Sequence, residues 1–141
     1  MNGLRQPRRV LLVEDSLADI ELTLEALSGA EFKSDVTTVR DGAAALDFLR
    51  NTPDGYPDLV ILDLNLPRMT GHEVLAAMRA DKSLRLIPVA VLTTSSAAPD
   101  VARTYELGAN CFLTKPTDFD RFVFVVQSVN NFWLGLVRLP H

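Results

Sequence analysis

The sequence predicts an α/β fold in which a parallel sheet is covered by helices on both faces. Short apolar runs alternate with helix-like stretches five times along the chain, which is typical of repeated strand–helix units. The apolar runs are nearly continuous, as expected for strands buried on both faces. Because crossover connections are right-handed, only a few doubly wound arrangements of these units remain.

The length and composition are typical of one domain with one hydrophobic core. The chain has 141 residues and a formal net charge of -4, which argues against nucleic acid or an anionic membrane as the main partner. A single cysteine, Cys111, excludes an intramolecular disulfide and a cysteine metal cluster. No stretch has the length of a signal or membrane-spanning segment, so we expect a soluble cytoplasmic protein.

The first strand–helix unit begins near the N-terminus. Residues 9–13 form an apolar strand that ends on the acid pair Glu14 and Asp15. Ser16 is a suitable cap for a helix that runs to about Leu27. Residues 35–39, which are rich in β-branched side chains, then predict the second strand.

The third strand leads to the acid that organises the rest of the chain. A turn at Asp41 and a short helix over 43–49 precede it, and residues 59–62 then run directly into Asp63. Open α/β sheets bind their ligands at the carboxyl ends of their strands, where this carboxylate would lie. The chain turns again at Pro67, and Gly71 opens the third helix.

Two further units complete the expected sheet. Residues 87–92 form an apolar strand that ends in a cluster of hydroxyl side chains, and the next helix runs from Pro99 to Leu107. A brief last strand over 110–113 is followed by a final helix, for which Thr117 or Asp118 is the expected cap.

Polar side chains follow several of these strands. They are Glu14, Asp15, Asp63, Thr93 and Lys115. Carboxyl ends of parallel strands share one edge of the sheet, so these side chains should meet there. Three carboxylates together need a cation such as Mg²⁺, while a lysine and a hydroxyl are good donors to phosphate oxygens. The set therefore predicts a phosphoryl-transfer site in which the carboxylate of Asp63 is the nucleophile.

The order and spacing of these residues, with the run Asp63-Leu64-Asn65-Leu66-Pro67, Gly71 and Pro116, resembles the receiver domain of two-component response regulators. The resemblance covers nearly the whole chain. It implies a flavodoxin-like (βα)5 fold with a five-stranded parallel sheet of order 2-1-3-4-5. It also implies that Asp63 accepts a phosphoryl group from a sensor histidine kinase.

The resemblance assigns roles to the metal and phosphate ligands. Glu14 and Asp15 match the acid pair that binds the metal together with Asp63, and Asn65 matches the position whose backbone carbonyl completes the Mg²⁺ shell, with Mn²⁺ as an alternative ion. Lys115 matches the lysine that binds the phosphoryl group.

The resemblance also assigns a switch and several structural residues. Thr93 matches the switch hydroxyl, and Phe112 matches the aromatic residue that turns inward after phosphorylation. Pro67 and Gly71 shape the loop after Asp63. The bond between Lys115 and Pro116 is expected to be cis, which would aim the lysine inward.

The expected organisation is an N-terminal extension over 1–8, a receiver domain over 9–131 and an apolar extension of the last helix over 132–141. With no output segment after the receiver, the resemblance implies a single-domain regulator that does not bind DNA. The sequence Asn131-Phe132-Trp133-Leu134, with Leu92-Thr93-Thr94-Ser95, further resembles regulators that partner phytochrome-type kinases.

The final helix is apolar around most of its circumference, so one face should meet a partner. We expect a homodimer built on the fourth and fifth helices and the last strand. Its expected interface residues are Phe122, Phe132, Trp133 and Leu134. The alternative is that the tail folds back on its own domain.

Three other functions fit parts of the pattern. A phosphatase of the haloacid dehalogenase type also uses an aspartate nucleophile, but it expects an acid where this chain has Asn65. A flavin-binding protein would need a phosphate-binding loop after the first strand, where the pair Glu14-Asp15 would repel phosphate. A receiver-like docking module needs no phosphorylation. The leading interpretation is a phosphoryl acceptor that assists its own phosphorylation and dephosphorylation, and not an enzyme.

Overall fold

The computed structural model describes residues 8–53, 55–94 and 97–140, and it has the predicted parallel sheet in the order β2-β1-β3-β4-β5. The strands are β1 (Arg8–Val13), β2 (Ser34–Val39), β3 (Leu59–Leu62), β4 (Val89–Thr93) and β5 (Cys111–Thr114). The helices are α1 (Leu17–Ser28), α2 (Gly42–Arg50), α3 (Gly71–Ala80), α4 (Ala98–Glu106) and α5 (Phe119–Asn131), and the π-helical turn η1 (Phe132–Leu136) continues α5.

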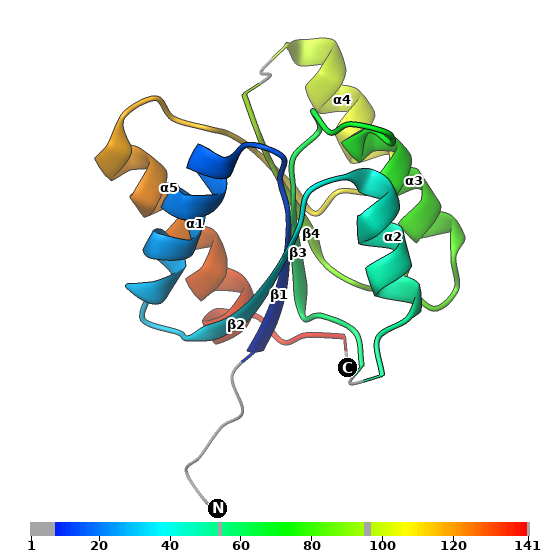
Figure 1. Ribbon diagram of the computed structural model, residues 1–141, viewed down its shortest axis with the longest axis horizontal. Coiled ribbons are helices and arrows are strands. Elements are labelled where there is room, and N and C mark those ends of the chain that lie inside the picture. Colours follow the sequence, from blue (N-terminus) through cyan, green and yellow to red (C-terminus); the bar gives the residue numbers. More distant parts are fainter. Residues whose placement is uncertain (1–7, 54, 95–96, 141) are drawn as a thin grey trace, which may run out of the picture.

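Helices cover both faces of the sheet, with α1 and α5 on one side and α2, α3 and α4 on the other (Figure 1). Side chains of each strand alternate between two apolar cores. Leu11 and Val13 of β1 face the core under α2 and α3, whereas Val10 and Leu12 face the core under α1 and α5. This alternation explains why the central strands are apolar at every position.

Polar side chains define where the helices begin. The hydroxyl of Ser16 accepts a hydrogen bond from the backbone N–H of Asp19, and the carboxylate of Asp118 accepts one from Arg121, so Asp118 rather than Thr117 caps the last helix. Thr70 and Glu73 form a reciprocal capping box at the start of α3. The helices therefore begin within a residue or two of the predicted positions.

The register of the strands brings their carboxyl ends together. Leu62 of β3 pairs with Val13 of β1 and with Val91 of β4, and Thr93 pairs with Thr114 of β5. The residues that follow these pairs therefore emerge on the same edge of the sheet, which we call the carboxyl edge.

The apolar segment after α5 packs largely on its own domain, which is the alternative that the sequence left open. Phe122 and Leu134 are buried in the core between the sheet, α1 and α5, so these two side chains cannot form the expected dimer surface. Gly135 lies against the ring of Phe32, where an added Cβ would come within 2.2 Å of a ring carbon. Leu139 is buried as well. The segment packs largely on its own domain because the apolar faces of α5 and η1 cover the sheet.

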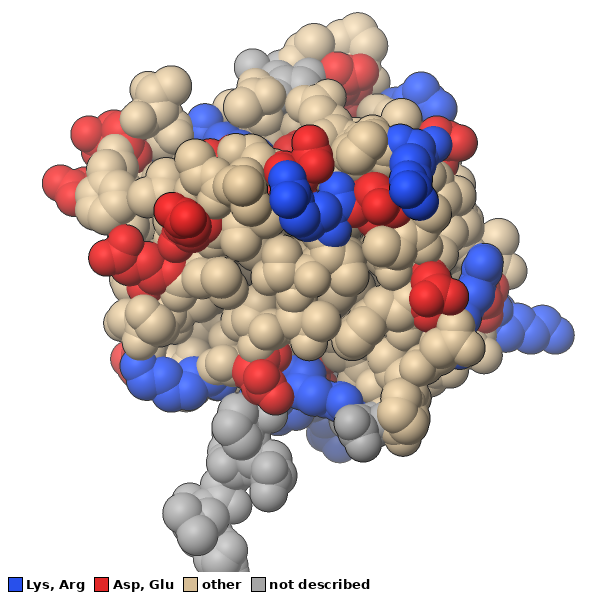
Figure 2. Space-filling view, viewed as in Figure 1, with Lys and Arg blue, Asp and Glu red and all other residues tan. Residues whose placement is uncertain are grey.

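Of the expected N-terminal extension over 1–8, Arg8 belongs to β1 and residues 1–7 lie outside the described residues. None of the helices in the described part of the chain is both long and apolar enough to cross a bilayer. Figure 2 shows acidic side chains gathered over the side of α1 and α5, and no continuous basic patch among the described residues on this face.

Candidate functional site

Asp63 lies directly after β3, and only 6 % of the residue is exposed. Its backbone N–H donates to the carbonyl of Val13 at 3.0 Å, which fixes the residue beside the end of β1. One carboxylate oxygen, Oδ1, accepts from the backbone N–H of Asn65 at 3.3 Å, and the other, Oδ2, accepts from the ammonium of Lys115 at 3.1 Å. The loop and the sheet thus hold the carboxylate in one orientation.

Lys115 follows β5, and its side chain is 7 % exposed. Its Nζ donates to Glu14 at 2.5 Å, to Asp19 at 2.8 Å and to Asp63 at 3.1 Å. Burial opposes the charge, but the hydrogen bonds to Asp19 and Glu14 and the charge of Asp63 outweigh it and raise the pKa of the ammonium. Lys115 is therefore a fixed positive charge, and its three N–H donors are all in use.

In Glu14, unlike Lys115, burial outweighs the hydrogen bonds in its effect on the pKa. Burial raises the pKa of this carboxyl group, and the charge of Asp63 acts in the same direction, while hydrogen bonds from Lys115 and from the backbone N–H of Ser16 partly offset both. Three carboxylates share one ammonium here, so the pocket holds an excess of negative charge.

Asp15 does not join this cluster. Its exposed carboxylate lies 3.7 Å from the guanidinium of Arg40, which also donates to the backbone carbonyl of Asp15. Within residues 8–53, 55–94 and 97–140, no three His, Cys, Asp or Glu side chains converge in the manner of metal ligands. The ammonium of Lys115 contacts Glu14 and Asp63, two of the three acids that were expected to face a cation.

Thr93 lies at the end of β4 and is fully buried. Its hydroxyl oxygen has no hydrogen-bond partner among the described residues, although buried polar groups are nearly always paired. The backbone carbonyl of Thr93 accepts from the N–H of Lys115 at 2.7 Å, so the hydroxyl and the lysine belong to neighbouring strand ends. The hydroxyl can donate to a group that arrives at the carboxyl edge.

The loop after Asp63 depends on a residue without a side chain at position 71. A Cβ on Gly71 would lie 2.4 Å from the backbone oxygen of Asp63 and 2.6 Å from the Cα of Leu64. The N–H of Gly71 donates to the carbonyl of Leu64, and that of Met69 donates to the carbonyl of Pro67. Gly71 thus lets α3 begin directly behind the acid.

Two residues near Lys115 are Pro116, whose peptide bond was expected to be cis, and Phe112, which was expected to be a switch residue. The bond between Lys115 and Pro116 is trans, so the expected cis bond is wrong, and the lysine reaches the acids from a trans backbone. Phe112 is half-buried and packs against the core under α2 and α3. Its backbone N–H donates to the hydroxyl of Tyr105, which links α4 to the outer edge of β5.

The sequence reasoning missed Asp19. This residue lies in the first turn of α1, and its carboxylate accepts the second hydrogen bond of Lys115. An acid in the first turn of a helix is usually explained by the helix dipole, which hid its relation to the pocket. The signal that could have identified it is the spacing of four residues from Asp15, which places both acids at the same end of α1.

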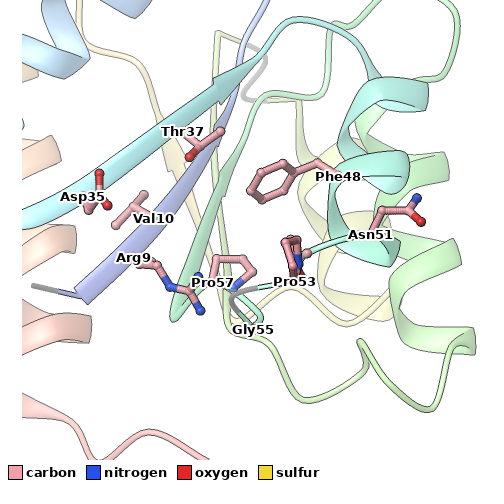
Figure 3. Close-up of a pocket in the computed structure, with 10 residues that line it drawn as sticks. Arg9, Val10, Asp35, Thr37, Phe48, Asn51, Pro53, Gly55 and Pro57 are labelled. Carbon is pink, nitrogen blue, oxygen red and sulfur yellow. The ribbon is translucent and has the colours of Figure 1, made fainter. Parts of the chain in front are cut away.

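A second hollow of the molecule lies away from these charges. A cavity of about 200 Å³ opens between the starts of β1 and β2 and the loop after α2 (Figure 3). Arg9, Asp35, Thr37, Phe48 and Asn51 are among its lining residues. It lies at the opposite end of the strands from Asp63, so it is separate from the carboxyl edge.

The carboxyl edge therefore combines an anchored carboxylate, a fixed ammonium, a buried hydroxyl without a partner and an excess of acid. A carboxylate can attack phosphorus, and an ammonium and a hydroxyl can donate to phosphoryl oxygens. Catalysis of phosphoryl transfer consists mainly of positioning and charge neutralisation, which this arrangement provides.

Comparison with known proteins also indicates a receiver domain. The pattern that defines the response regulator receiver domain matches residues 10–127. The response regulator Rcp1 of Synechocystis sp. is 44% identical over 140 residues, and the match covers 95% of this chain and 94% of that protein.

Solved structures agree in fold over the same length. The phosphorylated cyanobacterial phytochrome response regulator RcpA is 40% identical with a TM-score of 0.91, and the match covers 96% of this chain and 100% of that one. The Mn²⁺-bound form of response regulator Rcp1 is 42% identical with a TM-score of 0.89, with the same coverage of both chains. The flavodoxin-like receiver fold is thereby confirmed.

Proposed function

Because this chain belongs to the response regulator receiver family, whose members accept phosphoryl groups in two-component signalling, we propose that Asp63 is its acceptor. The observation that carries this proposal is the pairing of the anchored Asp63 carboxylate with Lys115, beside the unpartnered hydroxyl of Thr93. The acceptor assists its own phosphorylation and dephosphorylation, and we do not assign it a separate substrate.

The proposed reaction is an in-line transfer to a carboxylate oxygen. A side-chain oxygen of Asp63 forms a bond to phosphorus as the bond between phosphorus and the donor's leaving group breaks, and the leaving group retains the electron pair. Lys115 and Thr93 donate hydrogen bonds to the phosphoryl oxygens. The Asn65 N–H, which already contacts Asp63, holds the attacking carboxylate in place.

We propose that the acids of the carboxyl edge bind a divalent cation. Glu14 and Asp63 are buried acids that share a single ammonium, and Asp15 is near them in sequence with an exposed carboxylate. We propose that these three acids and the backbone carbonyl of Asn65 hold Mg²⁺ or Mn²⁺, since oxygen ligands and excess negative charge suit both ions. When bound, the cation would neutralise charge on the carboxylates and the phosphoryl oxygens.

We propose a sensor histidine kinase of the phytochrome type as the donor, acting in the cytoplasm. The support is the similarity over nearly the whole chain to RcpA, which is a cyanobacterial phytochrome response regulator. The short sequence elements around Thr93 and Trp133 point to the same group of regulators.

We propose that the phosphorylated state is communicated through α4, β5 and α5. Thr104 is the only residue of α4 that is fully buried, and its hydroxyl lies 2.9 Å from Nε2 of His72 on α3. The hydroxyl of Tyr105 accepts from the backbone of Phe112. These two bonds link α4 to α3 and β5, and we propose that the helix shifts when Thr93 turns toward a phosphoryl group and Phe112 repacks.

We propose a homodimer whose interface does not include Phe122 and Leu134, because both side chains are buried in the core. Phe124, Phe132 and Leu136 are 61%, 50% and 75% exposed, and all three belong to α5 and η1. Trp133 contributes an edge-to-face contact with Phe132. Large exposed apolar side chains that gather on one part of a surface are typical of a protein contact. A monomer in sedimentation at micromolar concentration would contradict this part of the proposal.

The experiment that tests the acceptor is intact mass after incubation with acetyl phosphate, with and without Mg²⁺. The wild-type protein is expected to gain one phosphoryl group only when Mg²⁺ is present, and Asp63→Asn is expected to gain none. A gain of mass in Asp63→Asn, or no gain in the wild type even with a histidine kinase, would reject the assignment.

A further inference from the structure

Asp19 brings an additional carboxylate to the ammonium of Lys115. Its Oδ2 lies 2.8 Å from Nζ, which is shorter than the 3.1 Å between Nζ and Asp63. The first turn of α1 fixes the position of Asp19, since the backbone N–H of this residue donates to the capping hydroxyl of Ser16. The side chain of Asp19 is 27% exposed, whereas that of Lys115 is 7% exposed. Asp19 is thus the solvent-facing member of the cluster.

All three N–H donors of the Lys115 ammonium are already occupied. An ammonium has three N–H donors, and Glu14, Asp19 and Asp63 each accept one of them. A phosphoryl group on Asp63 needs a donor from Lys115, so at least one existing bond must break when the group arrives. Asp19 is the partner that the proposed metal-binding set does not include, and it is also the most exposed of the three.

Space for this exchange is present next to Asp19. A cavity of about 310 Å³ lies between the start of α1 and the start of α5. Asp19, Thr94, Lys115, Pro116 and Asp118 are among the residues that line it. Asp19 lines this cavity, so its carboxylate has space beside it into which it can turn.

We propose that Asp19 is a positioning residue that holds Lys115 back in the unphosphorylated protein and competes with the phosphoryl group for its ammonium. This inference rests on the proposed function, because it concerns the lysine that would bind the phosphoryl group. Asp19 does not contact the reacting atoms. It acts through Lys115, and it sets how readily that ammonium becomes available.

The test compares Asp19→Asn with the wild type under acetyl phosphate and saturating Mg²⁺. The variant keeps the size of the side chain and an oxygen acceptor but loses the charge that holds the ammonium. We expect phosphorylation to be about fivefold faster and loss of the phosphoryl group after donor removal to be about twofold slower, since residues in contact commonly couple by free energies that correspond to changes of this size. Glu21→Gln is the matched control, because it removes the same charge from an exposed position of α1 and should change neither rate.

A measurement without metal or donor checks the same contact. Acylation of Lys115 by a reactive ester, followed by peptide mass spectrometry on the metal-free protein, is expected to rise about threefold in Asp19→Asn, because a bonded ammonium is protected. In a Lys115→Met background, Asp19→Asn should no longer change the phosphorylation rate.

The outcomes separate the two proposals. A wild-type protein that never gains a phosphoryl group contradicts the proposed function. A wild type that is phosphorylated, with an Asp19→Asn variant that is equal or slower, overturns the role of Asp19. A rate increase that persists in the Lys115→Met background also overturns it, since Asp19 would then act on the donor and not through Lys115.

Discussion

The two ends of the sheet use charged residues in opposite ways. At the carboxyl edge, three carboxylates share the ammonium of Lys115, and the hydroxyl of Thr93 has no partner among the described residues. At the other end, which we call the amino edge, Arg79 donates four hydrogen bonds to acceptors of the surrounding loops. The carboxyl edge has more hydrogen-bond acceptors than donors, whereas at the amino edge each guanidinium nitrogen of Arg79 has an acceptor.

The acceptors of Arg79 explain its role. Its guanidinium bonds to the carbonyls of Gly108, Arg85 and Ile87 and to the side chain of Asn110, at distances of 2.9 to 3.1 Å. These groups belong to the loops that enter β4 and β5. Burial lowers the pKa of Arg79, but hydrogen bonds fill its planar fork. A half-buried charged group whose nitrogens all have hydrogen-bond partners, as here, stabilises the fold. Charged or polar groups with too few partners instead indicate a ligand-binding site.

The largest expected effect is the loss of the charge that holds the acids together. Lys115→Met should lower the free energy of unfolding by about 3 kcal/mol at neutral pH, because it leaves buried carboxylates without a counter-charge. Urea unfolding measures this loss. Mg²⁺ should restore part of the stability by occupying the acids. An unchanged urea midpoint would show that the acids do not depend on the ammonium.

The matching change at the amino edge should cost stability without affecting the chemistry. Arg79→Met removes four hydrogen bonds and should lower the free energy of unfolding by about 2 kcal/mol. Phosphorylation of the folded protein by acetyl phosphate should stay at the wild-type level. Arg85→Met is the control, because Arg85 is exposed and its side chain has no bond among the described residues, so its effect should be within about 0.5 kcal/mol.

A smaller effect is expected at the unpartnered hydroxyl. Thr93→Val keeps the shape of the side chain and removes a buried polar group without a partner, so the free energy of unfolding should rise by about 1 kcal/mol. The same variant should weaken the response of Phe112 to phosphorylation, which the NMR signals of its ring can report. A marked loss of stability in Thr93→Val would mean that the hydroxyl is bonded in the free protein.

The sequence predicted the sheet and the meeting of its strand ends because both follow from local patterns. Apolar runs of the right length specify buried parallel strands, and the topology then places Glu14, Asp63, Thr93 and Lys115 at one edge. These four residues come together in the structure as expected.

Other features depend on contacts that a pattern does not contain. Asp15 and Asp19 both precede or begin α1, yet only Asp19 reaches Lys115, because the helix start turns Asp15 toward Arg40. In α5 nearly every side is apolar, so the pattern could not show that Phe122 faces the chain's own core while Phe124 faces solvent. Such choices depend on how the helix is rotated against the sheet.

The measurement that tests the contrast between the two edges most directly is the stability of Glu14→Gln against that of Asp58→Asn. Asp58 is a buried acid of the amino edge whose carboxylate accepts from the N–H of Arg9 at 2.8 Å. Both free energies of unfolding would be taken from urea titrations of the metal-free proteins at pH 7. Each variant removes one buried charge, so the pair differs mainly in its surroundings.

The raised pKa of Glu14 determines the sign of the expected result. A carboxyl group whose pKa is raised on folding contributes stability below its ordinary value of 4.5, and this contribution is lost as the pH rises through the raised pKa. At pH 7, Glu14→Gln should therefore be more stable than the wild type by about 1 kcal/mol, with a smaller difference at pH 4, while Asp58→Asn should be less stable. A Glu14→Gln variant less stable than the wild type at pH 7 would contradict the account of an acid excess at the carboxyl edge.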